Sequence, residues 1–115
     1  MEQKQKIYIS GPISGHDINE RREVFKTASV VLQSMGYDPV DPIYFADLHP
    51  EDVTTHSHMK RDIHLLLQCD AIFMMRGWTH SKGCKVEFDV ATAIGLPVYF
   101  EEVYMESSGN LIKFE

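Results

Sequence analysis

Apolar residues follow two alternating spacings along the chain, and the alternation predicts the order of its strands and helices. Short apolar runs bounded by glycine, proline or polar residues are typical of strands, and they occur at "KIYISGP", "YDPVDPIYF", "DAIFMMRG" and "PVYFEEV". "NLIKFE" predicts a last strand. Helical spacing appears in three segments, which are "DINERREVFKTASVVLQSMG", "SHMKRDIHLLLQC" and the residues that follow "GWTHSKG".

The predicted helices have recognisable ends and inner faces. Asp17 with Glu20 three residues later resembles a capping box, and Gly36 suits a C-terminal stop. The inner face of the first helix is expected to be Val24, Ala28, Val31, Leu32 and Met35. That of the second is expected to be Met59, Ile63, Leu66 and Leu67. The third helix should end at Gly95 and Pro97.

Strands that alternate with helices predict an α/β domain of three layers, with helices on both faces of a mostly parallel sheet of four to five strands. A length of 115 residues predicts a single domain over 1–115. Ligands bind such sheets beyond the carboxyl ends of the strands. We therefore expect the site among the loops "GPISGHD", "DPIYFADLHPEDVTTHSH" and "RGWTHSKG".

The charge and cysteine content of the chain argue against some classes of binding partner and indicate its compartment. Seventeen acidic against eleven basic residues give a net charge of −6, which argues against binding to polymeric nucleic acid or to anionic membranes. A small anionic ligand at a local site stays compatible with it. Cys69 and Cys84 form no CxxC pair, and no window approaches the roughly 20 apolar residues of a membrane span. We expect a soluble, cytoplasmic protein with reduced thiols.

Glu87 is the first candidate for chemistry. It lies beside the apolar stripe of Val86, Val90, Ala91 and Ile94, in what reads as the first turns of the third helix. A carboxylate there is partly desolvated yet kept ionised by the helix N-terminus, which suits a nucleophile or a general base. An acid merely favoured by the helix dipole is the alternative.

Asp62 poses the same question in the second helix. It falls between Met59, Ile63 and Leu66, at the border of the apolar face. An ion pair with Arg61 is the structural alternative. Two carboxylates near one sheet edge are the arrangement that glycosyl chemistry uses.

Further candidates lie in the loops. "GPISG" predicts either an anion seat before a helix N-terminus or simply a tight turn, and it contains neither GxGxxG nor a Walker lysine. Ser81 and Lys82 could seat a phosphate or a sugar hydroxyl, although Ser81 equally suits a helix cap. Trp78 either stacks on a base or covers the sheet edge. The candidate substrate-binding residues are Ser10, Gly11, Pro12, Ile13, Ser14, Gly15, Trp78, Ser81, Lys82 and Gly83.

The histidines raise a metal alternative. They are His49, His56, His58, His64 and His80. The first four lie in the predicted second helix or in the loop before it. His56 and His58 with Asp62 or His64 could ligate zinc. No Cys pair or HExxH frame accompanies them, so we expect no metal and no cofactor.

Three pieces of the chain resemble the nucleoside 2-deoxyribosyltransferase-like family, which includes deoxynucleoside 5′-monophosphate N-glycosidases. The pieces are "IYISGPISG", "MKRDIHLLLQCDAIF" and "GWTHSKGCKVEFDVATAIGLPV", and they are most similar to a small bacterial and phage branch. The resemblance implies a Rossmann- or flavodoxin-like fold and a homodimer. It also implies cleavage or transfer at the N-glycosidic bond of a 2′-deoxynucleoside or its 5′-monophosphate.

The resemblance also implies roles for single residues. Glu87 matches the nucleophile that forms a covalent deoxyribosyl intermediate, Asp62 an aspartate that handles protons, and Tyr8 a tyrosine that holds the glutamate. Ser81 matches a phosphate-binding serine, whereas Ser14 stands where the monophosphate-cleaving relatives have an arginine. A catalytically silent nucleotide-binding module and a metal-dependent hydrolase are the competing hypotheses.

Overall fold

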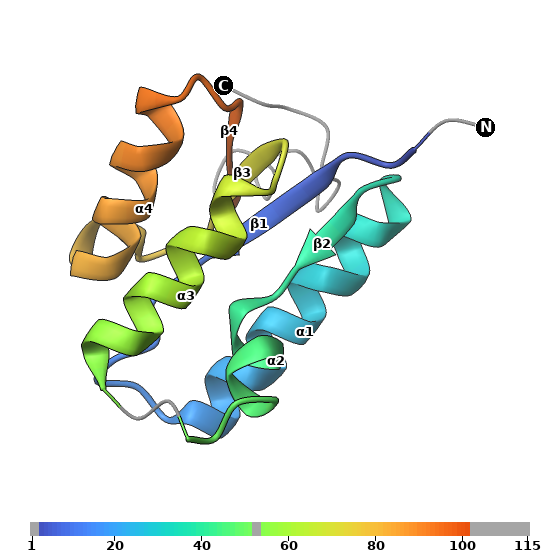
Figure 1. Cartoon of the computed structure of the whole chain (residues 1–115). Coiled ribbons are helices and arrows are strands. Elements are labelled where there is room, and N and C mark those ends of the chain that lie inside the picture. The colour runs from blue at the N-terminus through green and yellow to red at the C-terminus, as the bar shows by residue number, and fades with distance from the viewer. Residues whose placement is uncertain (1–2, 52–53, 102–115) are drawn as a thin grey trace.

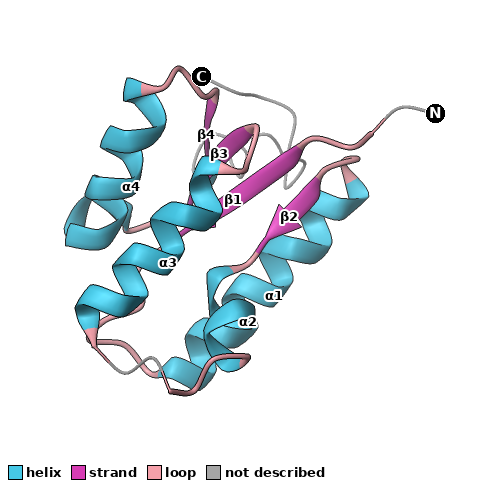
Figure 2. Cartoon of the chain, in the orientation of Figure 1, coloured by secondary structure: helices cyan, strands magenta, loops and turns pink. Residues whose placement is uncertain are grey.

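The computed structural model describes residues 3–51 and 54–101 of the chain, and it confirms the α/β prediction (Figures 1 and 2). The strands pair in parallel throughout, in the order β2-β1-β3-β4. This arrangement is consistent with a Rossmann- or flavodoxin-like domain. The elements are β1 (Lys6–Ser10), α1 (Ile18–Ser34), β2 (Asp38–Val40), α2 (Pro42–Asp47), α3 (Thr55–Leu67), β3 (Ala71–Met74), the 3₁₀ turn η1 (Trp78–His80), α4 (Lys82–Ala93) and β4 (Val98–Phe100).

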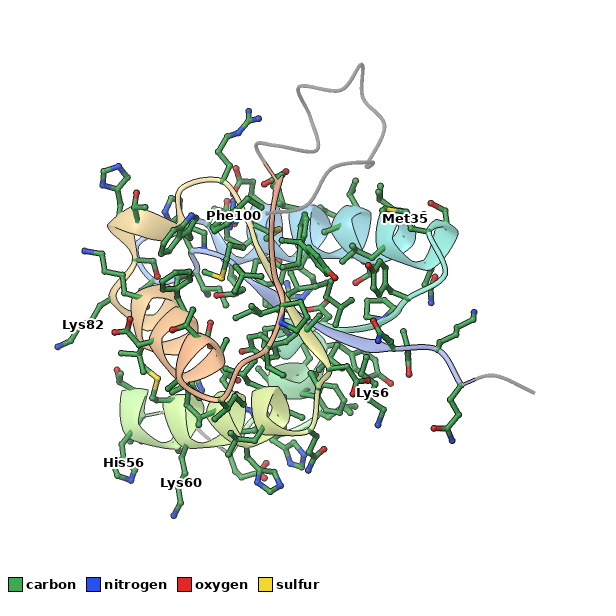
Figure 3. All side chains as sticks on the ribbon, turned by 90° about the horizontal axis from the view of Figure 1, so that it is seen from above. Lys6, Met35, His56, Lys60, Lys82 and Phe100 are labelled. Atoms are coloured by element: carbon green, nitrogen blue, oxygen red, sulfur yellow. The ribbon has the colours of Figure 1, made fainter. Side chains whose placement is uncertain are left out.

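Helices cover both faces of the sheet. Seen from above, α1 lies on one side of the strands and α3 and α4 lie on the other (Figure 3). The apolar cluster on the α1 side contains Ile7, Ile9, Phe25, Leu32 and Phe73. The cluster on the α3–α4 side contains Tyr8, Leu66, Ile72, Met74 and Ala91. Because the strands are parallel, their carboxyl ends meet at one edge, where the loops after β1 and β3 also begin.

The helix ends follow from local signals. Asp17 caps α1, since its Oδ1 accepts a hydrogen bond from the Asn19 backbone N–H at 2.8 Å. Gly36, just past the end of α1, has a φ of 95°, a conformation that favours glycine. Thr54 and Ser57 form a capping box at the start of α3.

Two details of the predicted elements are wrong. "YDPVDPIYF" forms a strand only over Asp38–Val40, because Pro42 then occupies the first turn of α2 and the Asp41 carboxylate caps it. Leu67 is 53% exposed although we expect it on the inner face of α3. It is the last residue of that helix and lies about 100° around the axis from the buried Leu66. The predicted strand "NLIKFE" lies outside the described residues.

No helix within 3–51 and 54–101 is both long and apolar enough to cross a lipid bilayer. Cys69 and Cys84 are free thiols, and both are buried.

Candidate functional site

The site begins with the alternation of side chains along β1. Ile7 and Ile9 face the α1 cluster, whereas Tyr8 and Ser10 point to the opposite face, toward α4. Both hydroxyl residues are fully buried, at 0% and 1% exposure. A buried hydroxyl needs a hydrogen-bond partner. Glu87 of α4 provides it for both.

Glu87 accepts one hydrogen bond on each carboxylate oxygen. Tyr8 Oη donates to Oε2 at 2.8 Å, and Ser10 Oγ donates to Oε1 at 2.6 Å. Glu87 itself is only 7% exposed. The two donors hold the carboxylate plane in one orientation at the interface between α4 and the sheet.

The position of Glu87 in the helix differs from the sequence-based expectation. It is the sixth residue of α4, and the first turn of that helix contains no acidic residue. It lies on the buried stripe itself, together with Cys84 and Ala91, whereas Ile94 is half exposed. The positive end of the helix is therefore a full turn away, and its influence falls off over that distance.

Burial dominates the electrostatics of Glu87. Desolvation raises the pKa of its carboxyl from 4.5 to about 7, although the Ser10 and Tyr8 hydroxyls act to lower it. The charge of Asp62 raises it further. Burial thus favours the neutral form of Glu87 and opposes the ionised carboxylate that the sequence analysis expects. Burial and the neighbouring Glu87 also raise the pKa of the Tyr8 phenol well above its usual range.

Asp62 of α3 is the second carboxylate of the site. Its side chain is 17% exposed, and its Oδ1 lies 3.8 Å from Arg61 Nε. Burial raises the pKa of Asp62 from 3.8 to about 6, against the opposing charge of Arg61. Asp62 also acts electrostatically on Glu87 and Tyr8, so α3, α4 and β1 bring all three predicted catalytic residues into one site.

The glycine-rich loop after β1 is anchored to the core. Gly11 and Pro12 are buried, whereas Ser14 and Gly15 are exposed. Ile13 packs against the α1 cluster. The loop is therefore partly structural, with only its tip open to solvent.

The sequence predicts an anion seat or a tight turn before α1, and two of the backbone N–H groups at the start of that helix are already used. The Asp17 carboxylate accepts hydrogen bonds from the Asn19 and Glu20 backbone N–H groups, the donors that an external anion would use. Arg21, which the sequence analysis did not single out, donates from Nε to the Pro12 carbonyl oxygen at 2.7 Å. It fixes the loop from the first turn of α1.

The candidate residues at the start of α4 have mixed placements. Ser81 is the helix cap, because its Oγ accepts from the Cys84 backbone N–H at 3.3 Å. Lys82 is exposed and projects outwards (Figure 3). Gly83 faces α3, since a Cβ added there would lie 3.8 Å from the Met59 side chain. Ser81 thus has the capping role that the sequence offered as its alternative.

Trp78 belongs to an aromatic cluster at the sheet edge. Its ring stacks on Phe88 with centroids 4.8 Å apart, and it lies 5.9 Å from the Phe100 ring. The side chain is half-buried. Trp78 therefore covers the sheet edge, which is one of the two roles that the sequence left open for it.

The histidines do not form a metal site in the described part of the chain. Among residues 3–51 and 54–101, no three His, Cys, Asp or Glu side chains are close enough to hold a metal ion. His56 and Lys60 point away from the molecule on the outer side of α3 (Figure 3). His64 makes a hydrogen bond with Gln68, and His49 with Glu51.

The contact between Ser10 and Glu87 was not expected. Ser10 is predicted to bind substrate, and its hydroxyl also donates to the Glu87 carboxylate. The period of two along β1 contains the signal, because it puts Ser10 on the same face as Tyr8.

Together these contacts give the site a definite chemical character. A buried carboxylate held by two hydroxyls, next to a second half-buried carboxylate, can act as a nucleophile or exchange protons. No curated protein matches the chain. A family described as a domain of unknown function, DUF4406, matches residues 5–100, which is most of the chain. The chain belongs to the DUF4406 family.

Proposed function

We propose that this protein cleaves or transfers the N-glycosidic bond of a 2′-deoxynucleoside or its 5′-monophosphate through a covalent glutamyl intermediate. The observation that supports the proposal is the buried Glu87 carboxylate, fixed on both oxygens and coupled to Asp62. A fixed anion stabilises the cationic, oxocarbenium-like transition state of glycosidic cleavage. It can also form the covalent bond that splits the reaction into two steps.

In the first step, a Glu87 oxygen bonds to C1′ of the deoxyribose while the bond from C1′ to the base nitrogen breaks. The electron pair stays on the base, which takes up a proton from Asp62. In the second step, water or another base attacks C1′, gives up a proton to Asp62, and releases the Glu87 carboxylate. Water as acceptor makes the reaction a hydrolysis, and a base makes it a transfer.

Burial raises the pKa of both carboxyls, to about 7 for Glu87 and to about 6 for Asp62, so the two groups titrate over the same pH range. The reaction needs Glu87 ionised and Asp62 protonated. When the pair holds one proton the two carboxyls share it, so this protonation state is one of those that the substrate meets.

The decisive experiment follows base release. Purified wild type would be incubated with a panel of 2′-deoxynucleosides and their 5′-monophosphates, with and without an acceptor base, and free base separated by chromatography. We expect release by wild type and a loss of at least about a thousandfold in Glu87→Gln. Intact-mass analysis should find a deoxyribosyl adduct on wild type alone.

A matched variant controls for the change of charge. Glu23→Gln removes one exposed carboxylate from α1 and should keep full activity. Base release by Glu87→Gln at the wild-type rate would refute the assignment. A nucleotide that raises the melting temperature without any base release would instead favour the silent binding module.

A further inference from the structure

The two hydroxyls that hold Glu87 come from different positions on β1. Tyr8 reaches its oxygen from the middle of β1 over a long ring. Ser10 is the last residue of β1, and one side-chain torsion places its Oγ. Its backbone is fixed by register with Met74 and by a 2.8 Å hydrogen bond from the Met75 N–H to the Ser10 carbonyl. Its hydroxyl therefore has little freedom to follow a moving carboxylate.

We propose that Ser10 is a positioning residue, which fixes the plane of the Glu87 carboxylate by donating to Oε1 and presents the group to the substrate as an anion. Its contact of 2.6 Å is shorter than that of Tyr8, and both partners are buried from water. Charge-assisted hydrogen bonds of this kind are the strong ones. The proposal rests on the glycosidic function proposed above for Glu87.

The electrostatic surroundings of Glu87 explain why this donor matters. Asp62 on α3 raises its pKa, and Tyr8 on β1 lowers it. Burial raises the pKa of the Cys84 thiol on the same helix, the Ser81 and Ser10 hydroxyls lower it, and the smaller effects of Glu87 and Arg21 oppose each other. Burial raises the pKa of Asp62 itself, and Arg61 beside it acts in the opposite direction and favours the charged form. Within this described set, the Ser10 hydroxyl is the largest influence that favours the Glu87 anion against burial.

The sign of the expected pH effect follows directly. A donor to the charged form lowers the pKa of a carboxyl, so its removal leaves burial less opposed. Glu87 then stays protonated up to a higher pH. A protonated carboxyl cannot attack C1′, and the acid limb of the rate profile moves toward alkaline pH.

The test uses two substitutions and two readouts. Ser10→Ala removes the donor, and Ser10→Gly removes the donor together with the Cβ, so the two variants leave spaces of different size. We expect kcat on the acid limb to fall roughly ten- to a hundredfold, while KM stays within about twofold. Agreement between both variants excludes a cavity effect. Ser34→Ala is the matched control. The Ser34 hydroxyl also makes a 2.6 Å hydrogen bond, to the Val31 carbonyl oxygen, at an exposed position of α1.

The second readout does not require activity. Isotope-edited infrared spectra distinguish a protonated carboxyl from a carboxylate, and subtraction of Glu87→Gln isolates the band of Glu87. We expect the protonated band to persist to higher pH in both Ser10 variants than in wild type and Ser34→Ala. An unchanged titration with only a lower melting temperature would overturn the proposal. Absence of base release from wild type would refute the glycosidic function, whereas the infrared titration would still decide whether Ser10 holds the Glu87 anion.

Discussion

The face of the sheet that packs against α1 is closed by apolar side chains, whereas the face toward α3 and α4 includes two carboxylates. One strand contributes to both, since Ile7 and Ile9 point one way and Tyr8 and Ser10 the other. The α1 face gains free energy from burial of apolar surface. The opposite face loses some of that gain, because Glu87 is buried where its charged form is disfavoured.

This difference separates stability from chemistry within one small domain. Glu87 occupies a helix position that an apolar residue would fill, between Cys84 and Ala91 on the buried stripe. A packed hydrocarbon there would stabilise the fold more than a carboxylate does. A carboxylate with two fixed donors at this position is what the proposed reaction requires.

Leu32→Ala on the α1 face is expected to change the free energy of unfolding most. Leu32 is fully buried in the apolar cluster, and its truncation should lower the free energy of unfolding by about 2–5 kcal/mol. Base release per folded molecule should not change. Urea denaturation and activity assays at low temperature measure the two quantities separately.

Val30→Ala on the same helix is the control for Leu32→Ala. Val30 is 63% exposed, so we expect a change below about 0.5 kcal/mol. Glu87→Gln should give the reverse pattern of Leu32→Ala, with activity lost and stability kept. A Leu32→Ala protein that remains folded but loses its activity would break the separation of the two faces.

A change of pH is expected to have a smaller effect on the free energy of unfolding. Glu87 has a higher pKa in the folded protein, about 7, than the 4.5 of an exposed carboxyl. Below about pH 4.5 the Glu87 carboxyl is protonated in both the folded and the unfolded state, and its contribution to the free energy of unfolding is fully present. As pH rises through about 7 this contribution is lost, because the carboxyl ionises first in the unfolded chain. Asp62 acts in the same direction between 3.8 and about 6.

Urea denaturation between pH 4.5 and pH 8 measures this contribution. Relative to Glu87→Gln, wild type should lose on the order of 1–3 kcal/mol of unfolding free energy over the range. Asp62→Asn should remove a smaller part of the slope. Parallel curves for wild type and Glu87→Gln would mean that Glu87 ionises as easily when folded as when unfolded.

The fold could be predicted from sequence because its signals are local. Strand and helix periods, the Asp17 cap and the Gly36 stop each lie within a few residues of the feature that they determine. The error at α2 has a local cause as well, since the Asp41–Pro42 pair serves equally to interrupt a strand and to start a helix.

The geometry of the site could be predicted only in part. The family resemblance implies that Tyr8, Asp62 and Glu87 act together. In the structure Tyr8 donates to Glu87, and Asp62 lies near enough to act electrostatically on both. The contacts to Glu87 span 79 residues from Tyr8 and 77 from Ser10, and they depend on how α4 packs over β1. That packing is non-local, so the role of Ser10 and the placement of Glu87 on the buried stripe needed the structure.

The smallest expected effects concern two glycines and have opposite signs. Gly11 follows Ser10, and an added Cβ would lie 2.5 Å from Met75 Cε and 3.1 Å from Phe25 Cζ. Both neighbours are buried, so Gly11→Ala should lower the free energy of unfolding by about 1–2 kcal/mol through overpacking. Because the strain acts next to Ser10, we also expect slower base release.

Gly83→Ala is the matched change on the other face. Gly83 lies in the first turn of α4, and an added Cβ would meet only Met59 Cε at an ordinary 3.8 Å. Alanine in a helix should raise the free energy of unfolding by about 0.5–1 kcal/mol. Thermal denaturation of both variants measures the two signs. A Gly11→Ala variant more stable than wild type would contradict the prediction. It would show that the Met75 and Phe25 side chains can move aside at little cost, and that packing around Gly11 is looser than the distances indicate.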